Sequence, residues 1–427
     1  MQNKVTVIGA GLAGCEAAWQ LAVRGIPVVL HEMKPEKRSE AHHSDDFAEL
    51  VCSNSLRSNE LTNAAGLLKE ELRRLGGLVI ACADAHQVEA GGALAVDREA
   101  FAKAVTEKIT SHPLIEVVRG EVTELPAEGH VIVATGPLTS DALFDAIHAK
   151  VGGDFLHFFD AAAPIVTFES IDMEHAYFAS RYDKGTPDYI NCPLSREEFD
   201  PFWEALTTAE EAEVHGFEDK LVFEGCMPIE VNARRGHDTL LFGILKPIGL
   251  PDPKTGRDPY AVLQLRRDNA QGTLYNLVGC QTRIFSMIPA LKNAEYVRYG
   301  VMHRNTFLDS PRLLDHNFAL RADPRIRFAG QMTGVEGYVE SNASGFLAGL
   351  ATACEILGKD APAFPSTTAI GALGSYISNG TVVKFQPMNI NFGILDPLGY
   401  KVKGKREKNM KISERALEII DRMKEEF

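Results

Sequence analysis

Residues 5–14 decide the fold of this chain, and they read Val5-Thr6-Val7-Ile8-Gly9-Ala10-Gly11-Leu12-Ala13-Gly14. The apolar run predicts a short buried strand, and the G-x-G-x-x-G turn after it predicts the start of a helix. In this motif the first glycine permits a tight turn, the second lets backbone approach a pyrophosphate, and the third lets helix pack on strand. A second apolar strand ends at Glu32, whose carboxylate can accept a hydrogen bond from a ribose hydroxyl. We therefore predict a dinucleotide site formed by residues 9–14 and Glu32. The alternative is a glycine-rich turn in another kind of α/β protein.

Two later strands also end at glycines. Residues 131–136 predict a buried strand that stops at Gly136, and residues 325–330 predict another that stops at Gly330 and Gln331. A glycine-rich turn and helix over 334–357 follow the second strand. A helix N-terminus in this position typically faces the pyrimidine edge of a flavin. A simple NAD domain does not need this second glycine-bearing strand, so we expect FAD, with Gly136, Gly330 and Gln331 among its ligands.

The middle of the chain has a different composition, rich in proline, aromatic residues and short strand-like runs such as 239–243. We expect an α/β protein: a Rossmann-like FAD-binding domain of the two-dinucleotide-fold flavoprotein type, with an inserted α+β domain. The expected boundaries give a first FAD-binding part over 1–165, an insert over 166–315 and a second FAD-binding part over 316–427. Helices are predicted over 64–75 and 98–109, and a terminal amphipathic helix over 412–423 with Ser413 as its cap.

Composition restricts the functional class. The 427 residues are 45% hydrophobic, contain no run long enough for a membrane span, and begin a strand too early for a signal peptide. Seven cysteines without C-x-x-C pairs predict reduced thiols in the cytoplasm. The formal net charge of -14 argues against a polyanionic partner. However, the tail is locally basic, either as a solvated surface or as a phosphate contact, through Lys401, Lys403, Lys405, Arg406, Lys408 and Lys411.

Two cysteines have polar neighbours that suit chemistry. Cys52 is followed by a polar segment in which Arg57 favours a thiolate, and Cys226 lies in a charged loop. The alternative for either is a small buried hydrophobe, an interpretation that suits Cys15, Cys82, Cys280 and Cys354, while Cys192 stays undecided. His303 lies between an apolar run and a polar cluster, although a lone histidine is commonly structural, and His42 and His43 are most simply loop residues. The sequence has no catalytic triad and no metal-ligand spacing.

Read together, several segments resemble one family, the folate- and FAD-dependent tRNA uridine-5-methyltransferases, TrmFO. The resemblance covers nearly the whole chain and is carried by residues 9–14, 52–58, 91–98, 134–140, 224–230, 299–307 and 328–345. The related GidA family shares the nucleotide fold but has a large extra C-terminal helical region. After residues 279–282 this chain lacks several polar residues that family members usually carry.

The resemblance implies C5-methylation of a uridine in the tRNA T-loop, with methylenetetrahydrofolate as carbon donor, FAD as cofactor and NAD(P)H as reductant. A thiolate that adds to C6 makes C5 nucleophilic. By similarity Cys226 is the nucleophile and Cys52 the general base, although the two roles could be exchanged. The one-carbon unit would pass by way of flavin N5. His303 would stack on the pterin, and Arg283, Arg298 and Arg304 would hold the folate carboxylates.

The implied partners are tRNA and folate, with no membrane and no stable protein partner. The target base must be turned out of its loop, and the tail lysines with Arg234 and Arg235 would contact the phosphate backbone. Three alternatives stay open: the same chemistry on a ribosomal-RNA uridine, an FAD-dependent oxidoreductase acting on a small molecule, and a flavin-binding RNA-binding protein without catalysis. The preference between NADH and NADPH also stays open.

Overall fold

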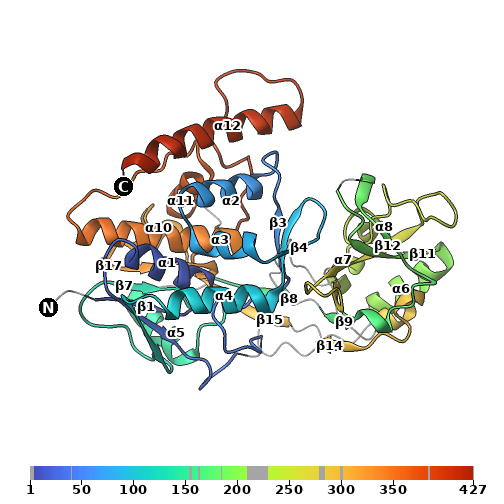
Figure 1. Cartoon of the computed structure of the whole chain (residues 1–427), viewed down its shortest axis with the longest axis horizontal. Helices are drawn as coiled ribbons and strands as arrows, with labels where there is room; N and C mark the ends of the chain where they lie inside the picture. The colour runs from blue at the N-terminus through green and yellow to red at the C-terminus, as the bar shows by residue number, and fades with distance from the viewer. Residues whose placement is uncertain are drawn as a thin grey trace.

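The computed structural model describes residues 4–39, 41–152, 156–161, 164–183, 185–208, 229–277, 284–298, 302–382 and 385–426. For residues 156–161, 298, 302–306 and 426 it describes only the backbone. The chain forms two parts, a larger one that carries both termini and a smaller one built from the middle of the sequence (Figure 1).

A six-stranded sheet forms the centre of the larger part, in the order β16-β17-β7-β1-β2-β6. All neighbours are parallel except β16, which is antiparallel to β17 at the edge. The strands are β1 (Val5–Ile8), β2 (Val28–Glu32), β6 (Ile115–Arg119), β7 (Val131–Val133), β16 (Ala319–Leu320) and β17 (Asp323–Phe328). Strand β1 lies inside the sheet, between β7 and β2, and its apolar side chains Val5, Val7 and Ile8 are buried. This arrangement confirms the Rossmann-like α/β fold.

Helices α1 (Leu12–Ala22) and α10 (Tyr338–Ile356) pack side by side against the sheet (Figure 1). Their backbones approach so closely that a Cβ on Gly345 would lie 2.1 Å from the carbonyl oxygen of Ala13. A Cβ on Gly14 would lie 1.8 Å from the carbonyl oxygen of Gly9. Glycine is therefore required at both positions, at the second because helix α1 packs directly on its own preceding turn.

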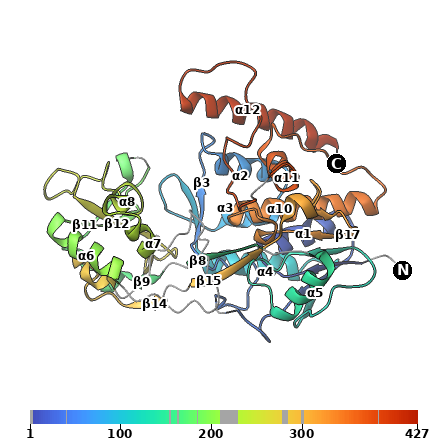
Figure 2. The ribbon, with the colours of Figure 1, turned by 180° about the vertical axis from the view of Figure 1, so that it is seen from behind.

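Further helices and a small sheet complete the larger part, and they surround one continuous hydrophobic core with the main sheet. The three-stranded sheet has the order β3-β5-β4. Figure 2 shows the helices from behind, with α12 along the outer edge. These elements are β3 (Ser55–Ser58), β4 (Gln87–Val88), β5 (Ala93–Val96), α2 (Ala64–Arg74), α3 (Leu78–Ala85), α4 (Arg98–Thr110), α5 (Asp141–Val151), α9 (Ser310–Leu313), α11 (Ala369–Ser378) and α12 (Lys405–Met423).

The smaller part contains a second sheet, antiparallel throughout, in the order β10-β11-β12-β13-β9-β14. Its own hydrophobic core lies between this sheet and the short helices beside it. The elements are β9 (Ile165–Thr167), β10 (Tyr177–Ala179), β11 (Tyr189–Leu194), β12 (Ala261–Arg267), β13 (Leu274–Leu277), β14 (Tyr296–Arg298), α6 (Arg196–Thr208), α7 (Ile229–Arg234) and α8 (His237–Phe242). The smaller part is thus α+β, and the domain boundaries at 165 and 315 remain a prediction.

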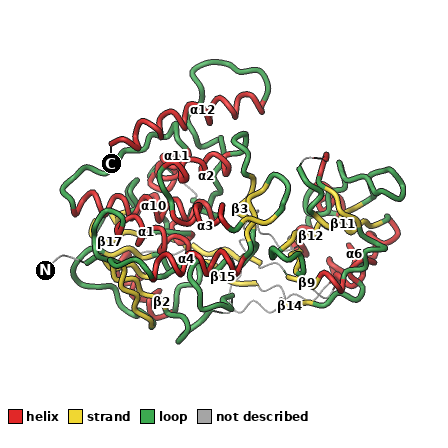
Figure 3. The backbone as a smooth tube through the Cα atoms, in the orientation of Figure 1, coloured by secondary structure: helices red, strands yellow, loops and turns green. Residues whose placement is uncertain are grey.

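The chain passes between the two parts along a two-stranded antiparallel ribbon. Strand β8 (Leu156–Ala161) leads towards the smaller part, and β15 (Met302–Phe307) returns beside it. Their register pairs Leu156 with Phe307 and Ala161 with Met302. The tube in Figure 3 shows this ribbon between the two parts.

Two sequence predictions about local structure were wrong. The run 239–243, expected as strand-like, forms the end of helix α8, in which Leu240 is buried and Phe242 is exposed. The terminal helix begins at Lys405, directly after Gly404, and therefore about two turns before Ile412, where the sequence predicted its start. Ser413 is no cap: it is buried inside the helix, and its hydroxyl donates a hydrogen bond of 2.6 Å to the carbonyl oxygen of Leu61.

Candidate nucleotide and active site

A pocket lies at the carboxyl ends of strands β1, β7 and β17. This is the edge at which ligands bind in open α/β sheets, because the strand order reverses there. The pocket brings together most of the predicted cofactor ligands, although they are far apart in the sequence. Its walls include Gly9, Ala10, Gly11, Leu12, Ala13, Glu32, Gly136, Gly330 and Gln331. Gly14 lies behind this wall, where it permits the close packing of helix α1.

The N-terminus of helix α1 is open towards the pocket. Gly11 is the N-cap residue and provides no side-chain cap, and the first turn carries no acidic residue. A Cβ on Gly11 would meet no atom within 4 Å. The backbone N–H groups of this turn, together with the partial positive charge of the helix end, therefore suit an anionic group. The residues present fit the pyrophosphate of a dinucleotide.

Glu32 lies at the end of β2 and is buried in the pocket wall. Its Oε2 accepts a hydrogen bond from the backbone N–H of Ala10 at 2.9 Å, and its Oε1 accepts one from the N–H of Lys34 at 2.9 Å. These bonds fix the carboxylate beside the glycine turn. Each carboxylate oxygen has a second acceptor site, so the carboxylate can still accept from a ribose hydroxyl.

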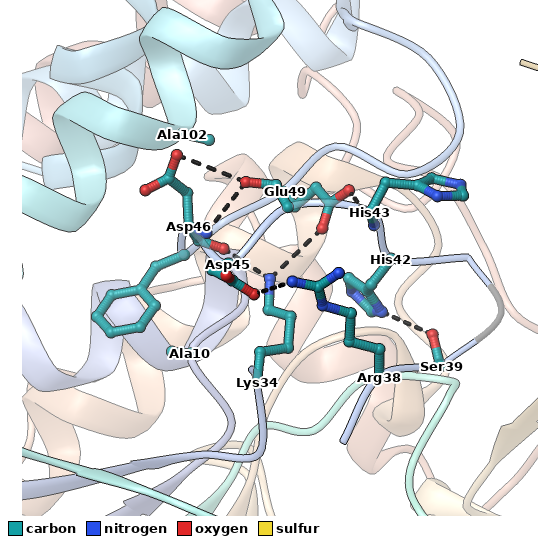
Figure 4. A network of polar contacts seen from close by, with 12 residues as sticks. Ala10, Lys34, Arg38, Ser39, His42, His43, Asp45, Asp46, Glu49 and Ala102 are labelled. Carbon is teal, nitrogen blue, oxygen red and sulfur yellow. Dashed lines mark hydrogen bonds and ion pairs between the residues drawn. The ribbon is translucent and has the colours of Figure 1, made fainter. Parts of the chain in front are cut away.

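A polar network after β2 forms a wall that the sequence did not predict (Figure 4). The buried Lys34 donates from Nζ to the carbonyl oxygen of Asp46 at 2.6 Å and lies 3.4 Å from Oε2 of Glu49. Glu49 in turn accepts from the backbone N–H of His43 at 2.8 Å. Lys34, His42 and Glu49 all line the pocket. His42 and His43 are loop residues as expected, but the proximity of His42 to the pocket has no local sequence signal.

Cys52 lies beside the pocket, next to Tyr338 at the start of helix α10. The hydroxyl oxygen of Tyr338 accepts hydrogen bonds from the backbone N–H groups of Cys52 at 2.8 Å and Ser53 at 3.1 Å. Tyr338 and Val51 line the pocket. Burial raises the pKa of Tyr338, so its hydroxyl stays protonated. Cys52 forms no disulfide with another described cysteine and is partly exposed, whereas the other four described cysteines are buried.

The guanidinium of Arg57, which the sequence predicted beside Cys52, binds another residue. Arg57 has a φ of +62°, and its guanidinium pairs with the buried Glu340 in the first turn of α10. Oε1 of Glu340 also accepts from the backbone N–H of Ile390 at 2.8 Å, while Oε2 has no hydrogen-bond partner among the described residues. The Arg57 backbone is supported by Lys69, whose Nζ donates to the carbonyl oxygens of residues 56–58. Arg57 is therefore tied to the start of α10.

The remaining predicted site residues are described in part or not at all. Cys226 and Arg283 lie outside the described residues, and so does the shortened segment after residue 282. Arg298 ends β14, and His303 and Arg304 lie in β15, where the structure gives their backbone but not their side chains. Their roles therefore stay predictions.

Comparison with known proteins identifies the family of this chain. The family model described as glucose inhibited division protein A matches residues 4–360. A protein of Acetivibrio thermocellus named methylenetetrahydrofolate--tRNA-(uracil-5-)-methyltransferase TrmFO is 60% identical over 428 residues, covering 98% of both chains. The chain belongs to the TrmFO family, within the wider glucose inhibited division protein A family. A TrmFO of Listeria monocytogenes is 57% identical over 435 residues and 100% of both chains.

Solved structures support the fold of this TrmFO family member. Aquifex aeolicus GidA in its form II crystal superposes with a TM-score of 0.72 at 14% identity, covering 100% of this chain and 73% of GidA. The form I crystal gives a TM-score of 0.70. At this identity the likeness concerns the fold alone. Among the described residues, no helix is both long and apolar enough to cross a membrane.

Proposed function

We infer that this chain catalyses the methylenetetrahydrofolate-dependent C5-methylation of a uridine in tRNA, forming ribothymidine in the T-loop. The observation that carries this function is full-length identity of 55–60% to proteins named as this methyltransferase. The pocket at the glycine turn supports the same conclusion, because the reaction needs a reductant and the pocket suits a dinucleotide. We further propose that the enzyme acts in the cytoplasm, where tRNA and reduced thiols occur together.

FAD is the cofactor that the pocket would hold. The first turn of α1 would bind the pyrophosphate, Glu32 would accept from the ribose, and the turns at Gly136 and Gly330 would approach the flavin side. When bound, FAD supplies the redox chemistry that completes the methyl group, with NAD(P)H as the source of electrons. The chain itself supplies the binding groups and the proton transfers.

We propose that Cys226 adds to C6 of the uracil and that Cys52 removes the proton from C5. Addition of a thiolate at C6 gives C5 enolate character, and loss of the C5 proton later restores the double bond as the thiolate leaves. The partial exposure of Cys52 beside the pocket supports its role as a base. His303 would stack on the pterin, with Arg283, Arg298 and Arg304 as ligands of the folate carboxylates.

The RNA would approach the basic end of helix α12. The helix is polarised: Lys405, Arg406, Lys408 and Lys411 lie in its first half and are exposed, whereas Glu414, Glu418 and Asp421 lie in its second half. Figures 1 and 2 show the first half extending above β3, on the side of the larger part that faces the smaller one. A local basic face of this kind can bind phosphates although the whole chain is acidic.

A methyl-transfer assay tests the function directly. It would combine unmodified tRNA transcript, methylenetetrahydrofolate, FAD and NADPH, and it would measure ribothymidine by mass spectrometry and tritium release from C5. We expect folate-dependent product from the wild type and at least a thousandfold less from Cys226→Ala and Cys52→Ala, in line with the loss of a nucleophile or base. Cys354→Ala, a buried cysteine in α10, is the matched control and should keep activity.

The outcomes separate the alternatives. No ribothymidine from an FAD-loaded wild type would exclude tRNA as the substrate and direct the same assay to ribosomal RNA. Full methylation by Cys226→Ala would contradict covalent catalysis by that thiol. Retained tritium release by either variant would contradict the role of the thiol it lacks, because loss of the C5 proton needs both the addition to C6 and the base.

A further inference from the structure

The junction between the two parts of the molecule is polar. Among the described residues, the hydrophobic core of the larger part and that of the smaller part have no member in common. Two parts joined by such an interface move relative to each other unless specific contacts hold them. Among the described residues, the polar contacts between them are hydrogen bonds and ion pairs, and most come from the segment 89–98.

Arg98 forms the more buried of the two ion pairs described across the junction. Its Nη2 lies 2.8 Å from Oδ1 of Asp268, which follows β12 in the smaller part, and the two side chains are 12% and 5% exposed. Its Nη1 donates to the carbonyl oxygen of Leu50, two residues before Cys52. Burial alone would lower the pKa of Arg98, but the Asp268 carboxylate offsets this and the pKa is raised. One guanidinium therefore links the Cys52 segment to the second sheet.

Neighbouring contacts reinforce the link. The side-chain nitrogen of Asn54 donates to the carbonyl oxygens of Val96 and Arg267, each at 2.9 Å. Oδ2 of Asp97 accepts from the backbone N–H of Ala270 at 2.9 Å. Residues 267–270 of the smaller part are thus hydrogen-bonded both to Asn54, two residues after Cys52, and to the start of helix α4. Farther along the junction, the N–H of Gly91 donates to Asp188 at 2.9 Å.

We propose that Arg98 and Asp268 are positioning residues of the methyl-transfer reaction: their ion pair fixes the Cys52 segment against the smaller part, in which strand β14 ends at Arg298, a proposed folate ligand. The inference rests on the proposed function, because only a reaction shared between the two parts needs this alignment. The pocket proposed for the cofactor is lined by residues of the larger part alone. A misplacement of about 1 Å between reacting groups can cost roughly a hundredfold in rate.

The test compares three variants of the holoenzyme. Arg98→Met leaves Asp268 buried and unpaired, so it also reduces thermal stability. The double variant Arg98→Met with Asp268→Leu removes both charges and should recover stability, because apolar residues of similar volume commonly replace buried ion pairs without loss. Glu89→Gln is the matched control: it removes an ion pair of 3.0 Å with Arg267 across the same junction, in which Glu89 is 62% exposed.

We expect kcat for ribothymidine formation to fall about a hundredfold in both Arg98 variants, with KM for tRNA and the rate of flavin reduction by NADPH within about twofold of wild type. Hydrogen exchange should show the amides of Cys52 and Ser53 opening at least about tenfold faster in the double variant. Glu89→Gln should behave as wild type in all four measurements.

Two results would overturn the proposal. The first is recovery of methyl transfer in the double variant together with stability, which would leave the pair a purely structural role. The second is unchanged exchange at Cys52 and Ser53 in the double variant. If the wild type forms no ribothymidine, the proposed function fails, but the exchange experiment still decides whether the pair holds the Cys52 segment.

Discussion

The contact between helices α1 and α10 and the junction between the two sheets hold the molecule together by opposite means. In the first, glycines bring two backbones into van der Waals contact around a continuous apolar core. In the second, side chains such as Arg98 and Asp268 form directed polar bonds between separate cores. Close packing is intolerant of added volume, whereas polar contacts depend on charge and hydrogen bonding. The pocket at the glycine turn is thus built on the rigid contact, and the second sheet is attached through the adjustable one.

Gly345→Ala should have the largest effect, because it adds volume to the rigid contact. The new methyl would lie 2.1 Å from the carbonyl oxygen of Ala13, and neither backbone can yield without separating the helices. The gain of about 1 kcal/mol from better helix propensity is too small to compensate. We expect a loss of about 3 kcal/mol or more in the free energy of unfolding, measured by urea titration. Gly399→Ala, whose Cβ meets nothing within 4 Å, is the control. Equal stability of both variants would mean that α1 and α10 are not in rigid contact.

Glu71→Gln should change the pH dependence of stability. Glu71 is fully buried and accepts from the backbone N–H groups of Ala369 and Ile370 at the start of α11, at 2.7 and 2.8 Å. Burial raises its pKa to about 8, so the folded protein binds a proton that the unfolded chain has lost above its ordinary pKa. Stability should therefore fall with rising pH by roughly 1 kcal/mol per unit between about pH 5 and pH 7.5.

Urea titrations of the wild type and Glu71→Gln across that range would measure this slope. The variant should lack it, while Glu70→Gln, on the exposed side of α2, should keep it. A wild-type curve that rises with pH relative to the Gln variant would contradict the raised pKa.

Gly11→Ala should separate stability from cofactor binding. Its Cβ meets no protein atom within 4 Å, so the apoprotein should lose less than about 1 kcal/mol of stability. The methyl group would instead occupy the space in which a pyrophosphate approaches the helix end. We expect FAD to bind at least about tenfold more weakly, equivalent to about 1.4 kcal/mol, in a fluorescence titration of the apoprotein. Unchanged affinity would place the pyrophosphate elsewhere.

His237→Gln should have the smallest effect, because it alters an exposed contact of the smaller part. His237 lies 2.9 Å from Asp200 and 3.1 Å from Asp238, and the hydrogen bond to Asp200, followed by that to Asp238, raises its pKa. The stabilisation is complete below about pH 6.5 and is lost as pH rises through the raised value. We expect a few tenths of a kcal/mol at pH 6 and no difference at pH 9. A difference that persists at pH 9 would indicate packing against Phe199 and Trp203 rather than charge.

The sequence predicted those parts of the site that are encoded locally. The turn at Gly9, the acid at the end of β2 and the glycines after β7 and β17 each follow an apolar strand, so parallel pairing brings them to one edge. The sequence did not predict contacts between segments that are far apart along the chain. Nothing near Arg98 indicates Asp268, and nothing near Glu71 indicates the start of α11. Arg57 illustrates the same limit: proximity in sequence to Cys52 did not decide its partner, because Glu340 lies within reach only after folding. The early start of α12 shows that a run of lysines can be helical when its other face packs on α2.

The ribbon of β8 and β15 brings together the two points at which the chain leaves the larger part and returns to it. Since Ala161 and Met302 face each other in register, the polypeptide exits and re-enters the larger part through adjacent backbone positions. A tight hairpin turn of two residues could close this gap. A chain in which such a turn replaced residues 162–301 would still contain every strand of the parallel sheet and every residue that lines the nucleotide pocket.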